Sequence, residues 1–297
     1  MFSKFSQKNH RLGLTMGMRY MMLSAFGFSI MAVCVKFASG QGIPVLEIVA
    51  ARAFVSLFLS YIDVRRKGIS LLGRKKLLLL SRGTVGALAL MCVYYAITHM
   101  PLAEATVLQY LHPMFTAILA LMFLKERIHV SVMLSIIFSF IGLLFIARPA
   151  LLFGVTENEF SYFAMGAAIL GAFGSAVAYV LVRKLNETED ASVIIFYFPL
   201  IALPVSLGLL GNDFVMPTGW AWGSLLMVGI FTQVGQIGLT KAMKTETAGR
   251  ATAFSYLQVI FAVLLGWMIF DEIPDIWVSL GGGFILIGAI INAFFKR

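Results

Sequence analysis

Residues 105–126 read ATVLQYLHPMFTAILALMFLKE, and residues 251–272 read ATAFSYLQVIFAVLLGWMIFDE. The second stretch follows the first by 146 positions, so that Tyr110 aligns with Tyr256 and Glu126 with Glu272. The same register continues without a gap from residues 96–147 to residues 242–293. The chain therefore contains one structural unit twice.

The loop at the end of each stretch differs in charge between the two copies. It reads Lys125-Glu126-Arg127 in the first copy and Asp271-Glu272-Ile273 in the second. Lysine and arginine collect on the cytoplasmic side of membrane proteins, so a copy inserted upside down loses the cations of the equivalent loop. The loops therefore predict two copies with opposite orientations in a bilayer, an arrangement typical of transporters.

The composition is that of a polytopic membrane protein. Hydrophobic residues make up 60% of the 297 residues, charged residues only 12%, and the mean hydropathy is +0.92. A helix needs about 20 apolar residues to cross the hydrocarbon core of a bilayer. The sequence predicts an all-α integral membrane protein with ten transmembrane helices, near 17–39, 44–62, 77–98, 102–124, 129–147, 161–182, 191–210, 219–240, 247–270 and 275–295.

The basic residues predict the orientation of these helices, with both termini in the cytoplasm. The predicted cytoplasmic segments then hold 18 of the 23 lysines and arginines, and only Arg148 lies outside. The 18 are Lys4, Lys8, Arg11, Arg19, Arg65, Arg66, Lys67, Arg74, Lys75, Lys76, Lys125, Arg127, Arg183, Lys184, Lys241, Lys244, Lys296 and Arg297. The net charge of +9 is thus explained by topology and by anionic lipid, without nucleic acid. We expect a multi-pass protein of the bacterial inner membrane.

Each copy comprises five predicted helices, in residues 17–148 and 161–295. The duplication extends back to the first helix of each half, because Gly27–Lys36 can be laid on Gly174–Arg183 with an offset of 147. Five is an odd number, so joining two copies in sequence inverts the second one. This agrees with the loop charges and predicts two inverted five-helix repeats around a central cavity.

Several short motifs in the first copy resemble the EamA domain of the drug/metabolite transporter superfamily. They are Tyr94-Tyr95-Ala96, Pro101-Leu102-Ala103-Glu104-Ala105-Thr106, Pro113-Met114-Phe115, Leu124-Lys125-Glu126-Arg127 and Gly142. The resemblance implies two five-helix domains that enclose a substrate cavity. Members of that superfamily export or exchange amino acids and other metabolites, take up S-adenosylmethionine, or carry nucleotide sugars. Arg148-Pro149 also resembles the solute carrier 35 type G branch.

Ionisable residues inside the predicted helices are the first candidates for a substrate site, since burying a charge in lipid is costly. Arg52 lies near the middle of the second helix, where its guanidinium can hold a carboxylate or phosphate through two hydrogen bonds; a structural bond to Glu47 is the alternative. Lys36 lies near the outer end of the first helix, where it either faces the cavity or reaches the headgroups. Arg82 and Arg250 lie near cytoplasmic helix ends, which favours contacts with headgroups.

The fourth and ninth helices carry polar residues at matching depth. His112 precedes Pro113, which disrupts the backbone hydrogen bonding of a helix, and it is either a substrate or proton site or a histidine satisfied within the bundle. Tyr110 and His112 align with Tyr256 and Gln258. Two residues of a regular helix that lie two positions apart point in different directions, so at most one of each pair needs to line the cavity.

Three further residues complete the predicted site. Gln233 and Gln236 lie three positions apart on the eighth helix and are expected to point inward, either to bind substrate or to join helices. Tyr94 is a candidate for the transport path or for ordinary packing. Cys34 and Cys92 are expected to be buried hydrophobic residues without a redox role.

The combined pattern predicts a secondary transporter that moves a small polar metabolite with an anionic group by alternating access. Candidate substrates are amino acids, compounds similar to S-adenosylmethionine, and nucleotide conjugates. A channel or a non-transporting assembly partner is the alternative. The sequence carries no metal-binding, phosphate-binding or catalytic motif, so we expect neither an enzyme nor a bound cofactor. Glycines within the predicted last helix, Gly281-Gly282-Gly283 and Gly288, indicate close packing and allow a homodimer contact.

Overall fold

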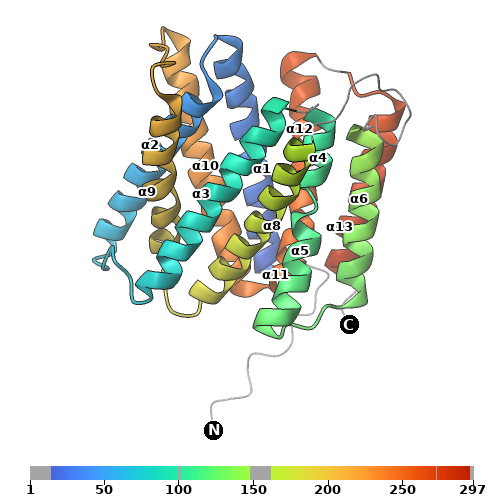
Figure 1. Ribbon diagram of the computed structural model, residues 1–297. Coiled ribbons are helices and arrows are strands. Elements are labelled where there is room, and N and C mark those ends of the chain that lie inside the picture. Colours follow the sequence, from blue (N-terminus) through green and yellow to red (C-terminus); the bar gives the residue numbers. More distant parts are fainter. Residues whose placement is uncertain (1–14, 100–101, 148–161, 272, 295–297) are drawn as a thin grey trace.

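The computed structural model describes residues 15–99, 102–147, 162–271 and 273–294, and these residues form helices joined by short loops (Figure 1). Ten helical segments within these described ranges are long and apolar enough to cross a membrane, which confirms the predicted fold class. Arg148, Glu272 and the terminal cations Lys4, Lys8, Arg11, Lys296 and Arg297 lie outside the described residues.

The first repeat contains α1 (Met16–Gly40), α2 (Val45–Arg66), α3 (Lys76–His99), an interrupted fourth span, and α6 (Val130–Ala147). The fourth span consists of α4 (Leu102–Gln109), α5 (His112–Leu119) and a π-helical turn (Ala120–Leu124). The second repeat contains α8 (Tyr162–Leu185), α9 (Ala191–Leu210), α10 (Trp220–Thr245), an interrupted ninth span, and α13 (Ile276–Phe294). The ninth span consists of α11 (Ala248–Ala253), a 3-10 turn (Phe254–Tyr256) and α12 (Leu257–Phe270).

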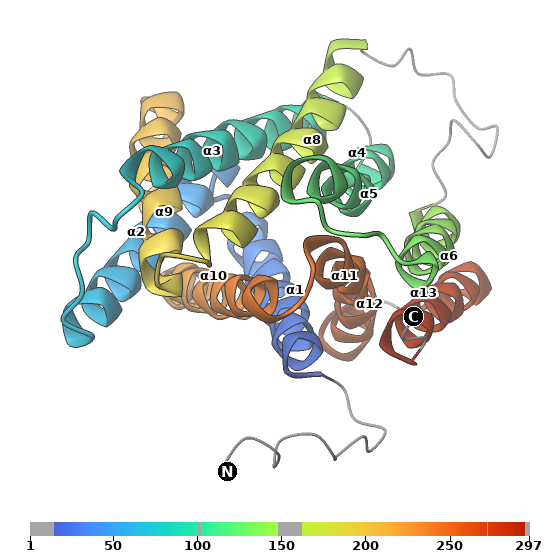
Figure 2. The same ribbon diagram turned by 90° about the horizontal axis from the view of Figure 1, so that it is seen from below.

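Helix packing follows the symmetry of the duplication. α1 packs on α10 and α8 packs on α3, so the first helix of each repeat contacts the third helix of the other. The second helices, α2 and α9, pack together, and so do the fifth helices, α6 and α13. In Figure 2 these last two pairs lie at opposite ends of the bundle, with the other helices between them. The two repeats therefore enclose a common centre.

The backbone repeats as well as the sequence does. Lys125 and Asp271 align with each other, and each ends its span in the left-handed conformation with a φ of 55°. They are the only positive-φ residues other than glycine in the described part of the chain. Such a φ is unfavourable for most side chains, so its occurrence at both equivalent positions reflects the shared geometry of the two loops.

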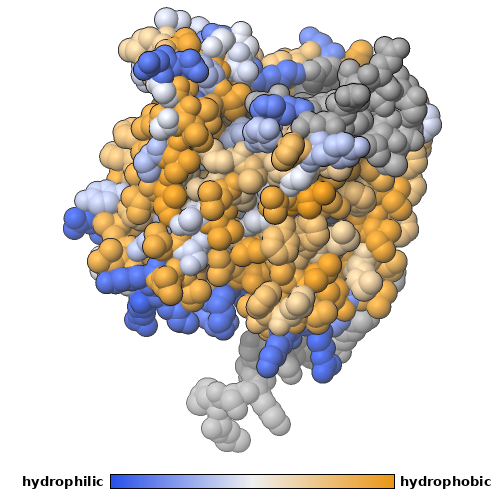
Figure 3. Space-filling view, in the orientation of Figure 1, coloured by the Kyte–Doolittle hydropathy of each residue, from blue (hydrophilic) through white to orange (hydrophobic). Residues whose placement is uncertain are grey.

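The surface shows a broad apolar band between two hydrophilic ends (Figure 3). Large apolar side chains within the spans are exposed to the surroundings, for example Phe54, Phe123 and Phe163. Exposure of this kind is unfavourable in water but suits contact with lipid chains.

Polar contacts join the loops at one end of the bundle. Lys67, which follows α2, forms an ion pair of 2.9 Å with Asp190 at the start of α9. Thr15, at the start of α1, donates a hydrogen bond to Glu246 at the end of α10. The guanidinium of Arg250 in α11 donates to the carbonyl of Asn292 in α13 at 3.0 Å. The segments that the sequence predicts to be cytoplasmic therefore meet on one face.

Glycines allow a close contact between α6 and α13. A Cβ added to Gly142 would lie 2.4 Å from the carbonyl oxygen of Gly281, and the reverse substitution would give the same distance. Gly288 also faces α6, whereas Gly282 and Gly283 have open space beside them. Two of the glycines considered for a homodimer thus serve packing within the chain, and the dimer itself stays a prediction.

Candidate functional site

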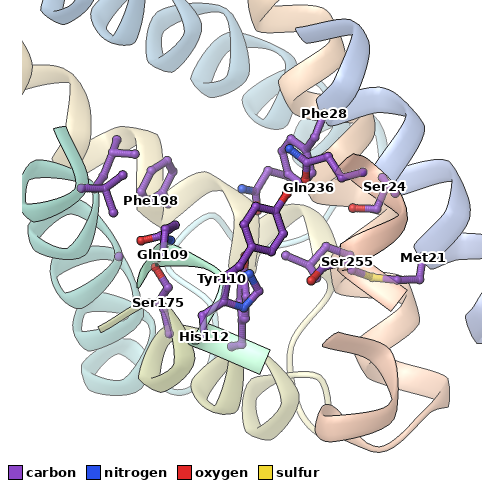
Figure 4. Close-up of a pocket in the computed structure, with 18 of the residues that line it drawn as sticks. Met21, Ser24, Phe28, Gln109, Tyr110, His112, Ser175, Phe198, Gln236 and Ser255 are labelled. Carbon is purple, nitrogen blue, oxygen red and sulfur yellow. Dashed lines mark hydrogen bonds between the residues drawn. The ribbon is translucent and has the colours of Figure 1, made fainter. Parts of the chain in front are cut away.

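A central cavity of about 280 Å³ lies between the two repeats. Its volume is close to the lower end of the range of small-molecule pockets. Both repeats contribute to its wall, as expected for the substrate site of a transporter with internal symmetry. The polar or aromatic residues that line it are Ser24, Phe28, Arg52, Arg82, Gln109, Tyr110, His112, Ser175, Tyr179, Phe198, Gln236, Ser255 and Gln258 (Figure 4).

The fourth span breaks where it meets this cavity. α4 ends at Gln109 and α5 begins at His112, next to Pro113, which has no N–H to donate to the preceding turn. Because the helix is interrupted, both Tyr110 and His112 line the cavity. The prediction that at most one of them needs to line the cavity assumed a regular helix, which this part of the chain does not form.

The ninth span changes geometry at the equivalent position. The 3-10 turn covers Phe254–Tyr256, and Ser255 and Gln258 line the cavity there. Tyr256 itself is buried, and its hydroxyl donates a hydrogen bond of 2.8 Å to the carbonyl of Tyr110. Both spans thus bring irregular backbone to the central cavity, where it is protected from lipid.

Two arginines in the wall share one aromatic neighbour. The guanidinium carbon of Arg82 lies 5.0 Å from the centre of the Phe198 ring, and that of Arg52 lies 6.0 Å from it. Arg82 is buried, and its Nη2 donates a long hydrogen bond of 3.4 Å to Oε1 of Gln236. Neither arginine forms an ion pair with a carboxylate among the described residues.

Four buried polar atoms in the wall have no hydrogen-bond partner in the described protein. They are Nε of Arg82, Oε1 of Gln109, Nδ1 of His112 and Oγ of Ser255. Buried polar groups are almost always paired, and leaving one unpaired costs about 1–3 kcal/mol. The residues around this cavity therefore keep hydrogen-bonding capacity that the described protein does not use.

Five of the nine predicted site residues line this cavity, namely Arg52, Tyr110, His112, Gln236 and Gln258. Four lie elsewhere. The Gln233 amide accepts from Ser56 at 2.6 Å and donates to Ser60 at 2.9 Å, so it joins α10 to α2. The ammonium of Lys36 lies 4.2 Å from the centre of the Phe270 ring. Tyr94 lines a separate apolar groove, and Tyr256 supports Tyr110 from behind the wall.

Six polar residues of the wall were not among the predicted site residues: Ser24, Arg82, Gln109, Ser175, Tyr179 and Ser255. Arg82 was interpreted as a helix-end residue that reaches the headgroups. It lies six residues after the first residue of α3, about 9 Å along the axis, and α3 packs there against the second repeat. The signal that could have identified Arg82 is its distance from the helix end, because it lies more than one turn inside α3.

Comparison with known proteins places the chain in a family. The model of the EamA-like transporter family matches residues 15–148 and again residues 162–294. The pseudopaline exporter CntI of Pseudomonas aeruginosa is 34% identical over 285 residues, which cover 96% of this chain and 98% of the exporter. Human solute carrier family 35 member G1 is 31% identical over 293 residues, which cover 95% of this chain and 80% of the carrier.

A solved crystal structure has the same fold, with a TM-score of 0.80 and 17% sequence identity over 94% of this chain and 96% of that chain. The family model and the two relatives confirm the resemblance seen in the motifs around Pro101 and Pro113. The chain belongs to the EamA-like transporter family and is a multi-pass membrane transporter.

Proposed function

We propose that this protein is a secondary carrier that moves a small polar metabolite with an anionic group across the membrane by alternating access. The observation that carries the proposal is the cation content of the central cavity. Arg52 and Arg82 contribute two guanidinium cations, and no carboxylate lies among the described residues of the cavity wall. An anionic substrate supplies the missing counter-charge.

The architecture supports the carrier mechanism. The cavity is built where interrupted helices of two inverted repeats meet, which is the usual location of substrate sites in secondary transporters. Rocking one repeat against the other would expose such a site first on one side and then on the other. The named activities of two relatives, a pseudopaline exporter and a solute carrier, agree with this class of function.

We assign the face that carries Lys67, Glu246 and Arg250 to the cytoplasm, because lysine and arginine concentrate in its loops. The membrane is then the bacterial inner membrane, with both chain ends inside. The name of the Pseudomonas relative favours export as the direction.

The test is transport by the purified protein in proteoliposomes. Liposomes are loaded with a deproteinised extract of bacterial cells, and the compounds that leave them are identified by mass spectrometry against protein-free liposomes. A carrier releases a limited set of anionic compounds, with a rate that saturates and that rises when the same compound is present outside. Electrical conductance without saturation would instead identify a channel, and release of no compound would contradict the proposal.

Arg52→Gln tests the role of the cavity cations, because it removes one cavity charge while it keeps hydrogen-bonding capacity. Transport by this variant should fall at least about tenfold, since hydrogen bonds to charged groups contribute about 1.5–3 kcal/mol. The variant should still elute as a single species in size-exclusion chromatography. Unchanged transport kinetics would remove Arg52 from the substrate site.

A further inference from the structure

The charges of the central cavity are unbalanced by two units. Arg52 and Arg82 both line it, and the described residues of the wall include no aspartate or glutamate. An arginine in the low-dielectric interior of a membrane protein normally has a carboxylate partner, because an unpaired buried charge is costly. This chain provides such a partner elsewhere. Arg183 forms an ion pair of 2.7 Å with Glu126, and Arg250 forms one of 3.3 Å with Glu246.

The guanidinium groups of Arg52 and Arg82 share a neighbouring side chain in the cavity wall. Their guanidinium carbons lie 5.0 Å (Arg82) and 6.0 Å (Arg52) from the centre of the Phe198 ring, and both residues line the same cavity as Tyr179. Figure 4 shows Phe198 and Gln236 at the wall of the same pocket. A single small ligand in the cavity can therefore reach both cations.

The hydrogen-bonding state of Arg82 also indicates a missing partner. The side chain is only 3% exposed, its Nε has no partner in the described protein, and its one hydrogen bond among the described residues is the long one to Gln236. A guanidinium presents five N–H donors in a planar fork that fits a carboxylate. Arg82 therefore lines the cavity with a buried Nε donor that has no partner in the described protein, an observation independent of the charge count.

Resting on the proposed carrier function, we propose that the substrate is a dianion whose two negative charges, carboxylates in the simplest case, are neutralised by Arg52 and Arg82 together. Arg82 is then a second substrate-binding residue, and each of the two arginines neutralises one negative charge of the substrate. A substrate with one negative charge leaves one buried guanidinium uncompensated, so it binds more weakly. A zwitterion with one carboxylate is disfavoured for the same reason.

Matched ligands of equal size test the number of charges. The probes are the dicarboxylates malonate, succinate, glutarate and adipate, and for each one the monoamide in which a neutral amide replaces one carboxylate. Binding to the purified protein is measured by isothermal titration calorimetry in a buffer of constant ionic strength. We expect at least one dicarboxylate to bind with a stoichiometry of one, about tenfold or more tightly than its monoamide.

Variants of the two arginines connect this preference to the cavity. Arg82→Gln and Arg52→Gln should each reduce the ratio of dicarboxylate to monoamide affinity to about one, because a single cation remains. Lys184→Gln removes one charge of an exposed ion pair with Glu187 outside the cavity, and it should leave the ratio unchanged. This control separates the local effect from the loss of net charge.

Three results would overturn the inference: monoamides that bind as tightly as the dicarboxylates, a stoichiometry of two monoanions per protein, or no binding by any dicarboxylate. A preference that survives in Arg82→Gln would likewise remove that residue from the site. Transport of a monoanionic metabolite in the proteoliposome experiment would contradict the dianion while it leaves the carrier function intact. Failure of all transport with intact dicarboxylate selectivity would contradict the carrier function alone.

Discussion

Gln233 and Gln236 show how two residues of the same type on one helix divide structural and binding roles. Both lie on α10, three positions apart, and the sequence alone left both roles open for each. Gln233 bonds to Ser56 and Ser60 of α2, whereas Gln236 reaches the cavity and accepts from Arg82. The difference of about 60° around the helix axis decides which neighbour each amide meets.

Replacing each glutamine by leucine should therefore give opposite results. Gln233→Leu loses two interhelical hydrogen bonds and should destabilise the protein by about 1 kcal/mol, with little change in dicarboxylate affinity. Gln236→Leu should weaken the affinity and have a smaller effect on stability. Thermal unfolding in detergent and calorimetric titration measure the two quantities. A Gln233→Leu variant with normal stability and impaired binding would reverse the assignment.

Arginine 82 shows where prediction of the site from sequence reached its limit. Polar residues deep in apolar spans, such as Arg52, His112 and Gln258, could be identified because their burial in lipid is unfavourable. Arg82 lies nearer a helix end, where an arginine can also reach the headgroups, and only the packing of α3 against the second repeat directs it inward. That Tyr110 lines the cavity together with His112 is evident only from the interruption between α4 and α5.

The break between α4 and α5 is the element that brings Tyr110 and His112 to the cavity together. Pro113→Ala restores a backbone donor and a strong helix former, so the two short helices can join into one. Tyr110 and His112 would then lie about 200° apart around a common axis, and one of them would leave the wall. We expect dicarboxylate affinity to fall roughly tenfold while the unfolding temperature is maintained.

A second proline supplies the comparison for this experiment. Pro204 lies inside α9, and it is exposed and does not line the cavity. Pro204→Ala should preserve affinity. Equal affinities of wild type and Pro113→Ala would show that the break is not needed for the site.

Glu126 connects a loop of the first repeat to two helices of the second. Its carboxylate accepts from Nε of Arg183 in α8 at 2.7 Å, and from the backbone N–H of Ala248 at the start of α11, also at 2.7 Å. Charge-assisted hydrogen bonds of this length are strong, and the positive end of α11 adds to them. These contacts hold the repeats together on the face that we assign to the cytoplasm.

Glu126→Ala should shift the carrier toward states that are open on this face. The reporter is Ile128→Cys, next to this contact, in a background in which Cys34 and Cys92 are alanine. Its labelling by a water-soluble maleimide should become at least about tenfold faster, since the lost bonds contribute about 1.5–3 kcal/mol each and about 1.4 kcal/mol corresponds to a factor of ten. Glu187→Ala breaks only an exposed ion pair with Lys184 and should leave the rate unchanged. Equal rates in both variants would show that Glu126 does not act as a closing contact.

The fold of the whole molecule could be predicted far better than the site. Ten apolar segments fix the helices, and the aligned loops at Lys125 and Asp271 fix the duplication, which the common φ of 55° repeats in the backbone. These properties depend on many residues at once, so an error at one position does not change the result. The site depends on single side-chain directions, which packing between the repeats determines.

The distribution of positive charge among the loops predicts which side of the membrane each loop of the second repeat faces. The loop between α8 and α9 contains exposed Glu187 and follows two cations, whereas the loop between α9 and α10 contains exposed Asn212 and no lysine or arginine. By the distribution of positive charge, the first loop is cytoplasmic and the second faces outward. In the same cysteine-free background, Asn212→Cys should react with a membrane-impermeant maleimide added to intact cells. Glu187→Cys should react only after the membrane is opened, because ten spans with positive loops inside leave it on the inner side. Labelling of position 187 in intact cells, with position 212 protected, would mean that the molecule is inserted the other way round and that the Glu126 contact closes its outer face.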